Sequence, residues 1–114
     1  MRSPTQLEME DLKRILNEEI ALCAEIEVLL AHKKEAVVAG ELDRLSVIDS
    51  QLEVLSQRTK NLEQNRLEIM VHLGREGETL REFISSLESG EDALILSQAR
   101  ERLLKATTGI KTLS

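Results

Sequence analysis

The feature that most constrains this chain is the spacing of apolar residues between positions 45 and 73. Residues separated alternately by three and four positions share one side of an α-helix, because the helix turns once every 3.6 residues. Only Thr59 and Arg66 are not apolar in this row, which runs Leu45, Ile48, Leu52, Leu55, Thr59, Leu62, Arg66, Ile69 and Leu73. Since no glycine or proline interrupts it, we predict one helix over about 42–73, roughly 45–50 Å long.

The preceding segment has a similar but wider apolar pattern. One row of apolar residues is interrupted by Glu19 and Lys33 and consists of Leu12, Ile15, Leu22, Ile26, Leu29 and Ala36. A second, adjoining row repeats every seven residues and consists of Leu16, Cys23, Leu30 and Val37. Together the rows form a stripe wide enough to contact more than one helix. We predict a helix over about 4–39, beginning at Ser3 and Pro4, which suit the first positions of a helix.

A glycine separates these two helices in the stretch "VVAGELDRLS". Gly40 follows the last expected helical residue, where a left-handed backbone conformation ends many helices and glycine adopts it without steric cost. The carboxylates of Glu41 and Asp43 then suit the positive end of the next helix. The sequence therefore predicts an antiparallel hairpin that turns at Gly40.

The rest of the chain predicts a shorter, interrupted helical region over about 78–113. The segment "LGREGET" (73–79) contains two glycines and ends the second helix, and we expect another break near 89–91, within "ESGED". Beyond that break, apolar residues again follow steps of three and four: Leu96, Ala99, Leu103, Ala106, Ile110 and Leu113. The predicted fold is all-α: a single domain over 1–114, with a long antiparallel helical hairpin and a third, broken C-terminal helical segment, as in a three-helix bundle or coiled coil.

Composition excludes several classes of partner. The formal net charge is −6, and the charged residues of both signs are mixed along the chain. Binding to nucleic acid or to an anionic membrane requires a clustered basic surface, so we expect neither. The first residues contain no apolar signal core, because Glu8, Glu10 and Asp11 fall where one would lie. No segment is long and apolar enough for membrane insertion, and we expect a cytoplasmic protein.

Residues that could support catalysis are few and scattered. His32 and His72 lie far apart along the predicted hairpin, and neither has a second histidine or a cysteine three or four residues away. Cys23 lies in the apolar stripe, where a buried, unreactive thiol is expected. We therefore predict no catalytic residue, no metal site and no cofactor, and we do not expect an enzyme.

Two stretches of the sequence resemble a known family. The run "LLAHKKEAVVAGELDRLSVIDSQLEVL" (29–55) combines a leucine pair, a charged step and the glycine turn with a second leucine-rich helix. The segment "GETLREFISSL" (77–87) follows it at the expected distance. Both are similar to the FlgN-like family of flagellar type III export chaperones.

That resemblance implies a function and a binding region. Members bind the C-terminal helical segments of hook-associated (hook–filament junction) proteins, prevent their premature association and deliver them to the export apparatus. Their client-binding region lies towards the C-terminus, which here corresponds to Leu96, Ala99, Leu103, Ala106, Ile110 and Leu113. For Leu96, Ala99 and Leu103, simple packing against the first two helices is an alternative interpretation.

A second function remains open at this point. The chain could be a structural or oligomerising coiled-coil protein with no chaperone role, its strict three–four spacing serving self-association. A homodimer through the C-terminal helical region, with "LGREGET" as the hinge of an exchanged segment, is compatible with either function.

Overall fold

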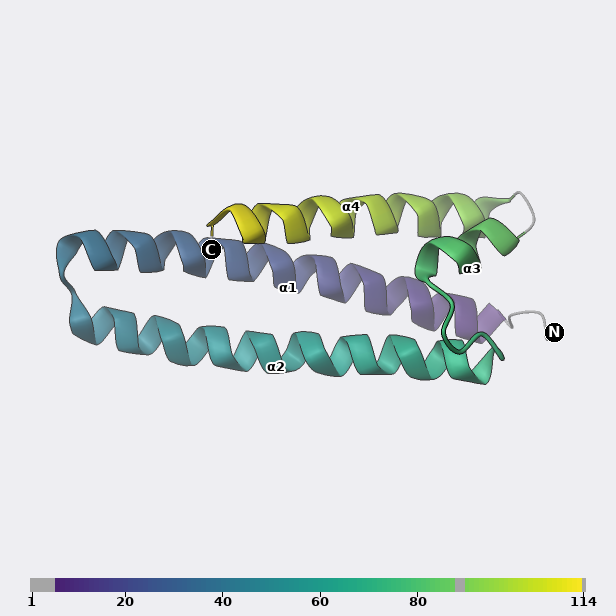
Figure 1. Ribbon diagram of the computed structural model, residues 1–114, viewed down its shortest axis with the longest axis horizontal. Coiled ribbons are helices and arrows are strands. Elements are labelled where there is room, and N and C mark those ends of the chain that lie inside the picture. The colour runs from purple at the N-terminus through teal and green to yellow at the C-terminus, as the bar shows by residue number, and fades with distance from the viewer. Residues whose placement is uncertain (1–5, 88–89, 114) are drawn as a thin grey trace.

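The computed structural model describes residues 6–87 and 90–113, with the side chains of 111–113 left out. Within these residues the protein consists of four helices: α1 (Gln6–Ala39), α2 (Leu42–His72), α3 (Leu80–Ser86) and α4 (Glu91–Leu113). The predicted all-α fold is confirmed, with a long hairpin followed by a C-terminal helical region in two pieces (Figure 1). The expected helix start at Ser3 and Pro4, and the part of the expected break on residues 88–89, lie outside the described residues.

The turn between α1 and α2 is made by Gly40, whose φ of 70° lies in the left-handed region. Its N–H donates to the carbonyl of Val37, and the N–H of Glu41 donates to the carbonyl of Ala36 over 3.0 Å. These bonds satisfy carbonyl groups that the end of α1 would otherwise leave without partners. The predicted role of Gly40 is therefore confirmed.

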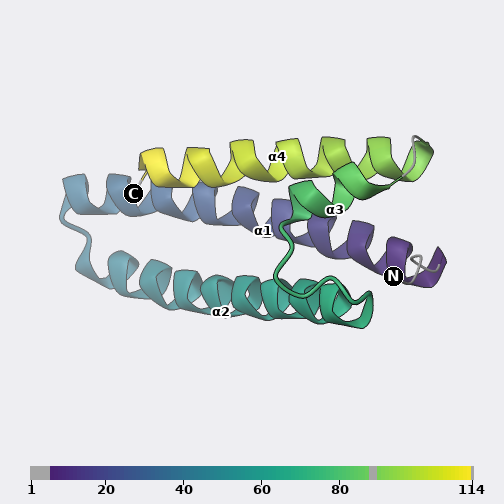
Figure 2. The same cartoon turned by 45° about the vertical axis from the view of Figure 1, so that its right-hand side comes forward.

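Helix α1 lies between α2 and α4, as both views show (Figures 1 and 2). It packs against each of them along much of its length, whereas the described parts of α2 and α4 stay apart from each other. The result is an elongated molecule with extents of 56 × 21 × 21 Å. The wide apolar stripe on α1 is explained by this arrangement, because α1 has two helical neighbours on different sides.

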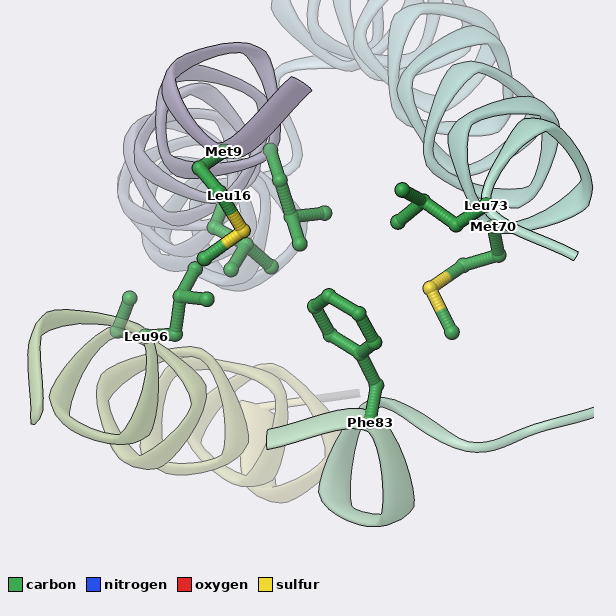
Figure 3. Packing of buried hydrophobic residues seen from close by; sticks show 8 residues of the cluster. Met9, Leu16, Met70, Leu73, Phe83 and Leu96 are labelled. Carbon is green, nitrogen blue, oxygen red and sulfur yellow. The ribbon is translucent and has the colours of Figure 1, made fainter. Parts of the chain in front are cut away.

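The main hydrophobic core lies at the end of the hairpin opposite Gly40. Phe83 of α3 is fully buried there and points between α1, α2 and α4 (Figure 3). The buried residues of this cluster are Met9, Leu12, Leu16, Met70, Leu73, Phe83, Leu96 and Ala99. Because α2 and α4 do not pack against each other, the side chain of Phe83 fills the space that separates them at this end.

Three of the polar residues that interrupt the apolar rows, Glu19, Lys33 and Arg66, take part in ion pairs across the hairpin. The carboxylate of Glu19 lies 3.3 Å from Nε of Arg66, and Nζ of Lys33 lies 2.8 Å from the carboxylate of Asp49. Glu19 is buried, while the Lys33–Asp49 pair is largely exposed. Both ion pairs lie in the same antiparallel register of α1 and α2.

Candidate functional site

The apolar row of α4, which the resemblance assigns to client binding, packs against α1. Leu96 and Ala99 are buried in the main core, and Leu103 is half-buried against it. Ala106 and Ile110 are half-buried further along α4, and the side chain of Leu113 lies outside the described residues. Leu96 and Ala99 therefore contact the interior of the protein. A client could contact these two side chains only after α4 had moved away from α1.

Small residues form much of the contact between α4 and α1. Ala99, Ala106 and Gly109 lie along α4, and the Glu27 carboxylate of α1 approaches Gly109 so closely that a Cβ atom there would collide with it. Small side chains permit close approach but remove little apolar area from water, so the contact contributes less stability than one made of leucines. At the other end of α4, Lys13 forms an ion pair with Asp92.

The connection from α2 to α4 is held by a residue that the apolar spacing did not reveal. Arg75 is largely buried and its guanidinium lies over the Phe83 ring, 5.4 Å from the ring centroid. The same guanidinium donates to the Ser86 hydroxyl over 2.7 Å and pairs with the Glu78 carboxylate at 3.1 Å. Thr79 accepts a hydrogen bond from the N–H of Glu82 and so caps α3. In the sequence, the sign of this arrangement is that Arg75 lies between two glycines and is followed three residues later by Glu78.

The described residues contain no arrangement suited to metal binding, since no group of three or more His, Cys, Asp and Glu side chains converges. Cys23 is buried, and its burial raises the pKa of the thiol, with the carboxylates of Glu19, Glu27 and Glu63 adding to the effect. A thiol with a raised pKa is ionised less and is a weaker nucleophile. Among the described residues, no helix combines the length and apolar character needed to cross a membrane.

A comparison with models of protein families decides the relationship. Residues 7–114 match the family described as FlgN protein. The chain belongs to the FlgN family. The match extends over all four helices and confirms the resemblance noted in the sequence. A search of curated proteins gave no match, and neither did a search of solved structures.

Membership in the FlgN family implies a general role as a chaperone in flagellar export, and therefore protein partners. The family is one of chaperones and is not known for enzymes. In this FlgN-family chain, the surface of α4 that faces solvent is mostly polar, although Leu94 and Leu104 are exposed, at 59% and 49% of their full accessibility. The α4 row that faces α1 is thus the more apolar of its two sides.

Proposed function

We propose that this chain is a cytoplasmic export chaperone for hook-associated proteins. It binds the C-terminal helical segment of such a client, prevents premature association of that segment and delivers the client to the type III export apparatus. The observation that carries this proposal is the placement of α4, an amphipathic helix that packs on α1 and α3 but, in the described residues, does not pack on α2. Helix α4 can therefore leave α1 while the α1–α2 hairpin stays closed.

In this proposal the client replaces α1 as the neighbour of α4. The client helix offers an apolar stripe, and the α4 row Leu96, Ala99, Leu103, Ala106, Ile110 and Leu113 offers a complementary one. The exchange is favourable only when the client contacts the open form better than α1 does, because a ligand shifts an equilibrium through differential affinity alone. The small residues of the α1–α4 contact keep the cost of opening low.

A reversible cross-link tests whether α4 must move. Glu27→Cys combined with Gly109→Cys, in a Cys23→Ala background, places two thiols where the Glu27 side chain already meets Gly109. We expect the oxidised protein to lose binding to C-terminal segments of hook-associated proteins and the reduced protein to retain it, as measured by calorimetry. Equal binding in both redox states would show that the inner row of α4 is not the client site.

A pair of substitutions tests the row itself. Ile110→Asp places a charge in the half-buried row, whereas Leu104→Asp places the same charge on the exposed side of the same helix. We expect only the first to abolish a stoichiometric complex in size-exclusion chromatography with light scattering. If no hook-associated segment binds the unmodified protein, the chaperone function is contradicted. Loss of helicity on dilution would then favour the alternative, an oligomerising coiled-coil protein.

A further inference from the structure

A hollow of about 490 Å³ lies at the C-terminal end of α2, where the chain leaves the hairpin. Its lining residues lie within 64–72 of α2 and 76–78 of the loop that follows, and no described residue of α1, α3 or α4 contributes to the lining. Helix α2 forms one edge of the molecule in both views (Figures 1 and 2). We call this surface the α2-end hollow.

Apolar side chains form the floor of the α2-end hollow. Leu67 and Val71 are four residues apart and therefore share one face of α2. They are 56% and 51% exposed, whereas the neighbouring Met70 is buried in the main core. The floor thus presents two large apolar side chains to water, and a partner that covered them would gain free energy from their burial.

The rim of the hollow is anionic. Glu68, Glu76 and Glu78 line it, and its described residues include no lysine or arginine. Glu78 pairs with Arg75, whereas Glu68 and Glu76 are exposed and form no ion pair within the part of the chain that the structure describes. Helix α2 ends at His72, so the partial negative charge of its C-terminal end adds to the potential of the carboxylates.

The α2-end hollow is separate from the apolar row of α4. In the described residues α4 does not pack on α2, and it supplies no side chain to the hollow. A partner can therefore occupy the hollow without displacing α4 from α1.

We propose that the α2-end hollow docks a cationic amphipathic helix of a protein other than the client. Apolar side chains of that helix pack on Leu67 and Val71, and lysines or arginines beside its apolar stripe pair with Glu68 and Glu76. The occupant is a helix rather than an extended peptide, because the described residues contain no strand to which an extended peptide could add. A helix satisfies its backbone hydrogen bonds internally and needs only side-chain contacts.

Charge complementarity selects this occupant over others. The chain has a formal net charge of −6, so a cationic partner is attracted from a distance and the local rim orients it. Nucleic acid and an anionic membrane carry the wrong sign. A small cation would match the carboxylates but would leave the side chains of Leu67 and Val71 in water. Only a partner that is both apolar and cationic satisfies the floor and the rim together.

The test uses two designed peptides of about 20 residues, a length that allows a helix to form in isolation. Both carry the same stripe of leucines, and they differ only in having lysines or glutamates beside it. We expect the full chain to bind the lysine peptide and not the glutamate peptide in calorimetry. The variant E68K/E76K should raise the Kd of the lysine peptide roughly tenfold or more, because two attractions become two repulsions.

A matched control separates the hollow from the overall charge of the protein. The variant E53K/E101K makes the same change in net charge at exposed positions outside the hollow and should leave the Kd within about twofold. The floor has its own pair of variants. Leu67→Ser should weaken binding of the lysine peptide, whereas Leu104→Ser, at a similarly exposed leucine of α4, should not.

Three outcomes contradict the proposal. Equal weakening by E68K/E76K and E53K/E101K would show a general attraction between opposite net charges, and unchanged binding by Leu67→Ser would exclude the apolar floor. Displacement of the lysine peptide by a C-terminal segment of a hook-associated protein would make the hollow part of the client site. Circular dichroism shows whether each variant is folded. The inference does not rest on the proposed chaperone function, whose tests measure client binding by α4.

Discussion

The carboxylate of Glu19 lies 3.3 Å from Nε of Arg66, in the interface between α1 and α2. The Glu19 side chain is 4% exposed and that of Arg66 is 24% exposed, so the pair is largely removed from water. The side-chain Nε–H of Arg66 does not form a hydrogen bond with Oε1 of Glu19. The two groups therefore interact mainly through their opposite charges. Such a pair adds little net stability, but removal of one member leaves the other charge buried alone.

Loss of Arg66 should therefore destabilise the hairpin more than loss of both charges. We expect Arg66→Met to lower the free energy of unfolding by about 3 kcal/mol, because Glu19 stays buried without its cation. The double variant E19L/R66M should recover most of that loss, since it replaces the pair by apolar contacts. Urea unfolding followed by circular dichroism measures both values. Equal destabilisation by the single and double variants would show that the charges are not coupled.

Glu19 should also give the protein a measurable pH dependence. Burial raises the pKa of the Glu19 carboxyl, the nearby Arg66 lowers it in part, and the Glu63 carboxylate raises it further, so that the net shift is upward. The folded protein then keeps this proton at pH values where the unfolded chain has lost it. The free energy of unfolding consequently falls as pH rises from the ordinary glutamate pKa through the raised pKa of Glu19.

Glu19→Gln isolates this effect, because glutamine does not titrate. We expect the variant to gain stability relative to the unmodified protein as pH rises through that window, and the difference to become constant above it. Urea unfolding of both proteins at a series of pH values from acidic to neutral provides the measurement. A difference that does not change with pH would show that Glu19 titrates alike in the folded and unfolded chains.

The turn at Gly40 should be sensitive to any side chain with a Cβ atom. A Cβ atom there meets no other atom within 4 Å, so the cost of Gly40→Ala comes from the φ of 70° alone. We expect a loss of about 1 kcal/mol in the free energy of unfolding, and a smaller loss for Gly40→Asn, because asparagine adopts the left-handed region more readily. Thermal unfolding compares the two variants, and an alanine that costs nothing would mean that the turn changes its conformation.

Phe83 should hold the two parts of the C-terminal region on the hairpin. Its ring is fully buried among residues from α1, α2 and α4 (Figure 3). We expect Phe83→Ala to cost about 3–5 kcal/mol, while Phe83→Leu, which refills most of the space, should cost less. Hydrogen exchange should also quicken in α4 more than near Gly40. Uniform acceleration along the chain would instead indicate that the protein unfolds only as a whole.

The hairpin could be predicted from the sequence because its signals are local. The three–four spacing from Leu45 to Leu73 defines one side of α2, and the left-handed conformation of Gly40 follows from its place after α1. Spacing also showed that α1 has too wide a stripe for one partner. It did not show which neighbour lies on which side, because that depends on the path of residues 73–87, in which Arg75 and Phe83 make long-range contacts.

The ion pair between Glu19 and Arg66 was visible in part. Each residue interrupts an otherwise apolar row, and the two have opposite charges, so an antiparallel register could have paired them. The candidate site was harder to predict for a different reason. Periodicity shows that Leu96 and Ile110 share one side of α4, but not whether that side packs on α1 or on another protein.

The position of α1 between α2 and α4 has a consequence for how sequences of this family can vary. A substitution in α1 must fit both long neighbours, α2 and α4, whereas a substitution in α2 need not fit α4 and one in α4 need not fit α2. Helix α1 should therefore be the slowest of the three to accept changes. Helices α2 and α4 should each co-vary with α1 but not with each other, so that α4, the helix we propose to bind the client, can diversify without disturbing the hairpin.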